Sequence, residues 1–524
     1  MDSLGNSRRN RTDLVVKSEQ FTQFVSDIKN TYLESRKEQG IRGLSESEAE
    51  SYFRHFEIVL ADLASAWSAD PELYIGYSRS KKYFIEGGSY WDYENSSPFI
   101  SERIFLRVID FLEHQQLIEN HVAKQGFSDI SSRMRAAPGL QTLFDEFEVN
   151  WACILTDPNA PVIFVKDTEN KNFISFPKPG KFDLEASRKN IRRINENLQS
   201  SLINLSISDD DFELIRRRLS RVGEQGIVET TDNDEFREPL EFSNRSLRRI
   251  FSLGSFSNGG RFYGGWWQGL PSEYRKFIEI EGCVTREMDY ATLQPHMLYA
   301  FVDREPPEDS YILEGWDVSL RPLIKKAFNQ LVNSDPSSRN PKQWHRFGPD
   351  LDPDPLPVDW GEMSLSQKIK SRRRQFEELT GRPYSDLLSD LIKFHEPIEN
   401  DFFSSAWGAT QNLDSQIAER VMIKLLDNSP PITALPIHDS FIVRRGGEKL
   451  LHNAMTESFS EVIGTECKID LDEAVYDPPE GYDGPSLVNM SDIEAETKSY
   501  METHRTYHIR DEQWRKVHGL YGYE

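Results

Sequence analysis

Two strand–turn–strand patterns, far apart in the chain, limit the folds that this sequence can adopt. Residues 276–290 alternate apolar and polar residues on both sides of Glu281-Gly282, which is typical of a β-hairpin. Residues 432–445 contain two apolar runs with His438-Asp439 at the turn between them. Each pattern places an aspartate at the end of a strand, so a sheet that contains both patterns can bring the two aspartates together.

Asp289 ends the first pattern, and Asp439 lies at the tip of the second. Phosphoryl transfer uses two hard cations, about 3.5–4 Å apart and held by carboxylate oxygens, to align an attacking hydroxyl with a leaving oxygen. We therefore predict that Asp289 and Asp439 are catalytic and hold two Mg²⁺ ions, with Mn²⁺ as an alternative. Because an aspartate at a strand end is also a common turn former, neither residue alone decides the question.

The motifs around these aspartates follow one another in a specific order. Gly260-Arg261 and then Gln268-Gly269-Leu270-Pro271 stand directly before the first hairpin pattern. Asp289-Tyr290 then begins an apolar stretch, and His438-Asp439-Ser440 comes last. In this order the motifs resemble those of the family A DNA polymerases and the phage-type single-subunit RNA polymerases. The resemblance covers about residues 255–445.

The resemblance implies a right-hand polymerase of the α+β class, with an antiparallel palm sheet and helical fingers, preceded here by an α-rich N-terminal domain. It implies that the backbone carbonyl of Tyr290 joins Asp289 and Asp439 as a metal ligand. The expected function is template-directed nucleotidyl transfer, in which a 3′-hydroxyl attacks a nucleoside triphosphate on a DNA or RNA primer-template.

Residues 319–332 are basic and amphipathic, and they resemble the fingers helix that grips the incoming triphosphate. Arg321 and Lys325 have the i,i+4 spacing that puts both side chains on one face. Lys326 is the alternative if the register is shifted by one residue. An ordinary basic helix face is the other interpretation of this segment.

The remaining motifs concern the primer-template. Residues 410–426 resemble the helix that precedes the last catalytic hairpin, and Gln411 is among the matching positions. Buried structural roles are the alternative for Arg261 and Gln411. The primer-template contacts that the resemblance predicts are Arg261, Gln268, Gln411 and His438.

The chain departs from the family pattern where nucleotide choice is decided. Asn333-Ser334 stands near the place where a Tyr-Gly pair is expected after the fingers lysine. Gln294, which lies five residues after Asp289 and is predicted to contact the nucleotide, is neither the Glu of the DNA enzymes nor the Gly of the RNA enzymes. Deoxynucleotide or ribonucleotide use therefore stays open, although a DNA polymerase is favoured.

The net charge of −24 counts against nucleic-acid binding, because proteins that follow a phosphate backbone normally carry a basic surface. Basic residues are nonetheless clustered at 215–221, 245–250 and 370–375. Each cluster is either part of a basic groove in an acidic molecule or a solvated helix face.

A chain of 524 residues is too long for one compact core, so several domains are expected. No apolar run approaches the roughly 20 residues of a membrane span. Three isolated cysteines without metal-ligand spacing fit a reducing compartment, and a cytoplasmic protein is expected. The expected parts are a disordered basic arm (1–15), a helical N-terminal domain (16–150), a small sheet with thumb-like helices (151–250), palm and fingers (251–475, fingers about 300–405), and an acidic, polar tail (476–524) that is either a docking helix or disordered.

Two rival functions remain. One is a polymerase-like scaffold that binds nucleic acid without turnover. The other is an HD-type metal phosphohydrolase, which His438-Asp439 and the scattered His296, His345 and His395 suggest. That fold places its His-Asp pair on a helix, whereas this pair lies between two β-like runs.

Overall fold

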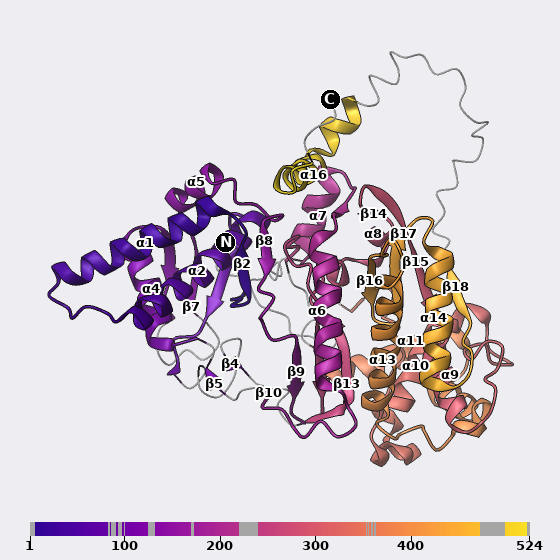
Figure 1. Ribbon diagram of the computed structural model, residues 1–524. Helices are drawn as coiled ribbons and strands as arrows, with labels where there is room; N and C mark the ends of the chain where they lie inside the picture. The colour runs from indigo at the N-terminus through magenta and orange to yellow at the C-terminus, as the bar shows by residue number, and fades with distance from the viewer. Residues whose placement is uncertain are drawn as a thin grey trace, which may run out of the picture.

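The computed structural model describes residues 6–81, 84, 91–92, 97–98, 100–123, 132–168, 172–219, 239–352, 354, 356–357, 360, 363–471 and 498–520. Three hydrophobic cores organise these residues, and Figure 1 shows the arrangement of their elements. No helix in this part of the chain combines the length and the apolar character that crossing a bilayer requires.

The N-terminal core packs helices against a sheet around α2 (Glu46–Ala69). Ser45 and Glu48 form a capping box that starts α2, and every residue from Ile58 to Ala66 is buried. The other helices are α1 (Glu19–Glu38), α4 (Glu102–His114) and α5 (Pro138–Glu146); the sheet order is β1 (Ser7–Arg9), β3 (Tyr74–Tyr77), β7 (Ser132–Ala136) and β6 (Ile118–His121), while β2 (Leu14–Val16) pairs with β8 (Ile154–Thr156) and β4 (Trp91–Asp92) with β5 (Ser97–Pro98).

The prediction of a disordered arm is wrong for residues 6–15, because β1 and β2 lie there and the Arg8 side chain is buried. Residues 1–5 lie outside the described residues. The N-terminal region also contains the sheet, which helical periodicity did not predict. Its strands are short and rich in polar residues, so they lack the long apolar alternation that indicates a strand.

The central core combines the segments expected as thumb-like helices and as palm into one packed unit. Gly408 allows α13 (Trp407–Leu426) to lie close to the strand that contains Asn258, since a Cβ there would meet Asn258 Oδ1 at 2.6 Å. One sheet has the order β10 (Phe173–Ile174), β9 (Ile163–Lys166), β12 (Arg248–Ser252), β13 (Ser255–Tyr263); the other has the order β11 (Ile203–Leu205), β14 (Ile278–Ile280), β15 (Cys283–Tyr290), β17 (Ser440–Arg444), β16 (Ala434–Ile437), with β18 (Ile469–Leu471) paired to β15; the helices are α6 (Leu184–Ser200), α7 (Asp209–Leu219), η2 (Trp266–Gly269), α8 (Ser272–Arg275), α13 and α14 (Glu448–Ile463).

The third core lies within residues 298–403 and is helical, in the segment expected to form fingers. It follows directly after Asp289 and returns to the central core through α13. Its elements are α9 (Leu293–Phe301), η3 (Val318–Leu320), α10 (Arg321–Asn333), η4 (Pro336–Arg339), η5 (Pro341–Arg346), α11 (Leu365–Thr380), α12 (Tyr384–Phe394) and η6 (Glu396–Ile398).

The end of the chain docks onto the central core as α16 (Arg505–Val517), which Figure 1 shows beside α7. The Arg245 guanidinium lies 4.9 Å from the Trp151 ring and 4.7 Å from the Trp514 ring. Arg510 donates hydrogen bonds to Asn204 and to the carbonyl of Leu205, each 2.8 Å long. Of the two alternatives for the tail, the docking helix is correct here, while residues 476–497 lie outside the described residues.

Candidate active site

The two predicted hairpins form and meet in the central sheet. The Glu281-Gly282 turn has φ values of 54° and 69°, the left-handed backbone that a two-residue hairpin turn favours. β15 pairs antiparallel with β17 so that Asp289 lies opposite Ser440. Asp439 lies in the turn between β16 and β17, directly before Ser440, and its carbonyl accepts a hydrogen bond from Tyr290 N at 3.5 Å. The two aspartates therefore belong to adjoining strand ends.

The two faces of β15 have different surroundings. Met288 and Tyr290 alternate with Asp289 and are buried, and the Tyr290 hydroxyl donates to the Met455 carbonyl at 2.7 Å. Glu287 shares the face of Asp289, where it accepts a hydrogen bond from the Ser440 hydroxyl. The apolar face fixes the strand against α14, and the other face carries the carboxylates.

Asp289 is held in an electrostatically unfavourable position. Its Oδ1 atom is buried and has no hydrogen-bond partner among the described residues. Burial raises the pKa of Asp289 to about 8, the charge of Asp439 adds to this shift, and Lys325 opposes it. Burial without a partner disfavours the carboxylate form, so a cation at this place would be stabilising.

The two carboxylates fit a Mg²⁺ site whose other ligands are water and substrate phosphates. Among the described residues, no group of three or more His, Cys, Asp or Glu side chains could hold a metal ion. Mg²⁺ is commonly bound through one or two carboxylates together with water and substrate phosphates, rather than by a cage of protein ligands. Two carboxylates with an unsatisfied oxygen agree with that mode of binding.

The three residues of α10 that are predicted to bind the triphosphate have different surroundings. Lys325 is half-buried, interacts with the carboxylate of Asp289, and makes no ion pair with any described residue. Lys326 forms an ion pair with Asp350. The Arg321 guanidinium is 2.7 Å from the Asp309 carboxylate. Of the two lysines, Lys325 is therefore the one whose charge acts on Asp289, while Lys326 is engaged by Asp350.

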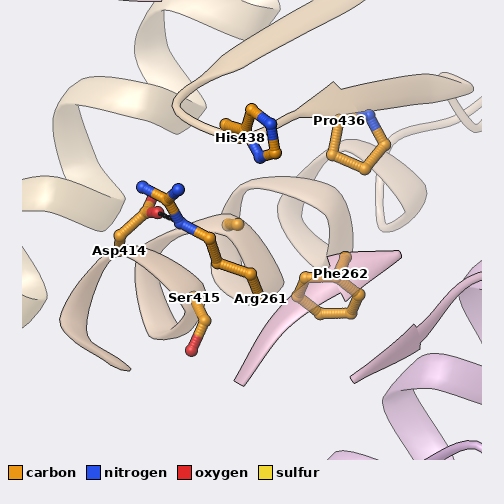
Figure 2. A pocket seen from close by; sticks show the side chains of 7 residues that line it. Arg261, Phe262, Asp414, Ser415, Pro436 and His438 are labelled. Carbon is orange, nitrogen blue, oxygen red and sulfur yellow. Dashed lines mark hydrogen bonds and ion pairs between the residues drawn. The ribbon is translucent and has the colours of Figure 1, made fainter. Parts of the chain in front are cut away.

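A small pocket adjoins the β16–β17 turn and contains two of the predicted primer-template residues, Arg261 and His438. Figure 2 shows Arg261 extending beneath His438 with its guanidinium against Asp414, and the ion pair measures 2.5 Å. His438 has a φ of 55°, a conformation that non-glycine residues adopt mostly at turns and functional sites. The pocket is lined by Arg261, Phe262, Asp414, Ser415, Ala418, Pro436 and His438.

Sequence reasoning missed Asp414, which is buried on α13. Burial raises its pKa to about 6, Arg261 opposes this shift, and Asp439 adds to it. Burial would lower the pKa of Arg261, but Asp414 and Asp439 outweigh burial and leave it raised. The sequence carried no distinct signal for it, because Asp414 is one of several polar residues on the buried side of α13.

The glutamines differ in position. Gln268 donates to the carbonyls of Phe262 and Pro436, each at 3.0 Å, and accepts from Gly264 N at 3.0 Å. Its amide therefore fastens η2 to the sheet, and its contact with a primer-template stays a prediction. Gln294 and Gln411 are half-buried on α9 and α13.

In the described part of the chain, no three His, Cys, Asp or Glu side chains gather as the metal centre of a phosphohydrolase would require. His395 is buried, lies 3.1 Å from the Tyr299 hydroxyl, and is 2.9 Å from the Ser310 carbonyl. Burial lowers its pKa to about 4. His345 is exposed at the end of η5. The pair His438-Asp439 lies in a β-turn and not on a helix.

The fold and the site thus define a protein of helices and largely antiparallel sheets with two aspartates at adjoining strand ends, followed by a helical unit in which Lys325 makes no ion pair with a described residue. No family model matches the chain, and no curated protein matches it. Among solved structures, the chain is similar to the POL domain of Pol1 from M. smegmatis in complex with DNA primer-template and dNTP. The identity is 12%, the match covers 49% of this chain and 50% of that chain, and the TM-score is 0.25, so it establishes no common fold.

Proposed function

We propose that this chain is a template-directed nucleic-acid polymerase that extends a 3′-hydroxyl with nucleoside triphosphates, with DNA synthesis favoured. One observation carries the proposal: Asp289 and Asp439 lie at adjoining strand ends, and an oxygen of Asp289 is buried without a donor. Paired carboxylates of this kind are what metal-assisted phosphoryl transfer uses.

The metal-holding groups are Asp289, Asp439 and the backbone carbonyl of Tyr290. When bound there, Mg²⁺, or Mn²⁺ in its place, would lower the pKa of an attacking hydroxyl and neutralise charge on the phosphate. The raised pKa of Asp289 supports this assignment, because a cation would offset both the burial of the carboxylate and its repulsion by Asp439.

The chain's other residues position the substrates. Lys325 binds the β- and γ-phosphates of the nucleotide, with Arg321 one turn before it on the same helix. Gln294, on the helix that follows Asp289, borders the nucleotide sugar. Arg261 and His438 contact the primer end, and Asp414 holds the Arg261 guanidinium in place.

The rival functions lack a supporting observation. A carboxylate such as Asp289, whose charge is not balanced by an ion pair, lowers the stability of the fold. A scaffold that only binds nucleic acid would not require such a carboxylate. A helix-borne His-Asp centre does not fit the β16–β17 turn.

The test is incorporation of labelled dNTPs and, separately, NTPs on primed DNA and primed RNA with Mg²⁺. The Asp439→Asn variant is the control. Incorporation by the wild type that the variant loses would support the proposal and would decide which sugar is used. Binding of primer-template without any incorporation would instead support the scaffold.

A further inference from the structure

Four arginines of the N-terminal region form no ion pair with any described residue. They are Arg36 in the last turn of α1, Arg42 in the loop between α1 and α2, and Arg103 and Arg107 on α4. Arg36 is half-buried, and the other three are exposed. Carboxylates are plentiful in a chain with a net charge of −24, so a group of arginines that lacks them is unexpected.

Two of these arginines are held beside one pair of tyrosine rings. Nη1 of Arg36 donates to the Tyr32 hydroxyl at 3.4 Å, and Nη1 of Arg107 donates to the Tyr52 hydroxyl at 3.2 Å. The centroids of the two tyrosine rings are 4.9 Å apart, and both residues are buried. The Tyr32 ring also lies 5.1 Å from the ring of Phe111 on α4. The packing of α1, α2 and α4 therefore brings the two guanidiniums to one place before any ligand arrives.

The other two arginines lie one helical turn away on the same side of α2. Arg103 precedes Arg107 by four residues on α4, the spacing that puts both side chains on one face. The charges of Arg42 and Arg103 both act on the carboxylate of Glu48, which stands one turn before Tyr52 on α2. All four arginines thus lie around the first two turns of α2.

Two carboxylates close to these arginines are engaged elsewhere. Glu48 accepts a hydrogen bond from Ser45 N at 2.9 Å and caps its own helix. Asp110, three residues after Arg107, lies 3.0 Å from the Arg79 guanidinium. Among the described residues, the hydroxyl of one tyrosine is the only hydrogen-bond partner of the Arg107 side chain. Its remaining N–H groups can therefore donate to a ligand.

We propose that this arginine cluster (Arg36, Arg42, Arg103 and Arg107) binds a phosphomonoester, as carried by a free nucleotide or by the phosphorylated end of a nucleic-acid strand. Arg36 and Arg107 contact the phosphate, and Arg42 and Arg103 add to the positive field around it. A phosphomonoester places about two negative charges and three acceptor oxygens at one point, which matches two guanidiniums held at one place. A phosphodiester of a nucleic-acid backbone carries only one charge at that point.

The cluster and the aspartates belong to different parts of the molecule. Tyr32 and Tyr52 are part of the N-terminal core, whereas Met288 and Tyr290, which flank Asp289, are part of the central core. Figure 1 shows α1, α2 and α4 on the opposite side of α6 from β15 and β17. The proposal therefore does not rest on the proposed function.

The test compares a DNA strand of about 12 nucleotides that carries a 5′-phosphate with the same strand ending in a 5′-hydroxyl. Both carry a fluorescent label at the 3′ end, and anisotropy measures both affinities without metal ions at one salt concentration. The wild type should bind the phosphorylated strand at least about tenfold more tightly. Arg36→Gln/Arg107→Gln should abolish this difference.

The matched control is Arg192→Gln/Arg445→Gln, which removes two exposed arginines that form no ion pair with a described residue. This control should keep the preference for the phosphorylated strand. Tyr52→Phe keeps the ring but removes the hydroxyl that holds Arg107, so it should weaken the preference by a smaller factor. Equal affinity of the wild type for the two strands, or an equal loss of preference in the cluster and control variants, would overturn the proposal.

Competition identifies the source of the phosphate. Displacement of the phosphorylated strand by a nucleoside 5′-monophosphate, but not by the nucleoside, would support the proposal with a free nucleotide as the ligand. Displacement only by the unlabelled phosphorylated strand would support it with a strand end as the ligand. If the 5′-hydroxyl strand competes equally well, the cluster attracts any backbone and the proposal is wrong. Since the assay needs no turnover, a failure of the proposed polymerase activity would leave these results readable.

Discussion

Carboxylates lie together in two regions of this protein, half-buried at the β16–β17 turn and fully buried where β1 meets α2, and the two regions treat the charge differently. At the second, which we call the junction, Arg8 is 2.7 Å from Asp62 and 2.7 Å from Glu241. Ser65 also donates to Glu241 at 2.9 Å. The junction thus supplies a cation from β1 and a hydroxyl donor from α2 to its two carboxylates.

At the turn, Asp289 faces Asp439 with no ion pair of its own. Buried carboxylates that are hydrogen-bonded and paired serve as a structural joint, whereas an uncompensated pair lowers stability unless something binds to it. We therefore infer that the junction stabilises the fold and that the turn binds a ligand. Substitutions in each region can test these two roles.

The largest expected effect is on turnover. Asp289→Asn or Asp439→Asn should reduce incorporation by at least about a thousandfold, because each removes a ligand for the metal ions. The melting temperature should stay the same or rise, since the repulsion between two carboxylates is removed. Asp350→Asn, which removes a carboxylate paired with Lys326, is the control and should remain active. Near-normal turnover in either site variant would refute the assignment.

The next effect concerns the stability of the junction. Arg8→Leu should lower the free energy of unfolding by about 3–5 kcal/mol, because Asp62 and Glu241 would stay buried without their cation. Urea unfolding measures this, and turnover per folded molecule should not change. Replacing Arg8, Asp62 and Glu241 together with apolar residues should recover most of the loss. If the Arg8→Leu protein is as stable as the wild type, the ion pairs of the junction do not stabilise the fold and the proposed difference between the two regions is wrong.

A pH dependence should accompany the junction. Burial raises the pKa of Asp62 to about 6, Arg8 opposes this shift, and Glu241 adds to it. Because this pKa lies above the value in the unfolded chain, the protonated group contributes stability at pH 4 and loses it as the pH rises through 6. The stability of the wild type relative to Asp62→Asn should therefore fall by roughly 2–3 kcal/mol between pH 4 and pH 7. A difference that is constant with pH would mean that Asp62 titrates normally.

Local signals account for the part of this architecture that the sequence predicted. The Glu281-Gly282 turn follows from the alternation of its flanking strands, and both hairpins carry their aspartates at strand ends, so their meeting needed only one shared sheet. The strand β1 had no such signal. Its Ser-Arg-Arg sequence indicates an exposed arm, and Arg8 is buried because Asp62 and Glu241, both remote in sequence, lie around it.

Tertiary contacts likewise decide the details of the candidate site. Asp414 is one polar residue on α13, and only its approach to Arg261 distinguishes it from others. Gln268 matches a motif position, yet its hydrogen bonds to Phe262 and Pro436 engage it within the protein. Periodicity could not separate adjacent lysines on α10, because the fold determines which of them approaches Asp289.

The smallest effect should separate those two lysines. Lys325→Gln should lower kcat/KM for the nucleotide by about tenfold, as expected when one charged contact to a phosphate is lost. Lys326→Gln removes the same charge from the same helix but only breaks the exposed pair with Asp350, so its effect should be close to none. Single-nucleotide incorporation kinetics compare the two variants directly. The reverse order would place Lys326 on the triphosphate, shift the helix register by one residue, and make Lys325 a partner of the carboxylates alone.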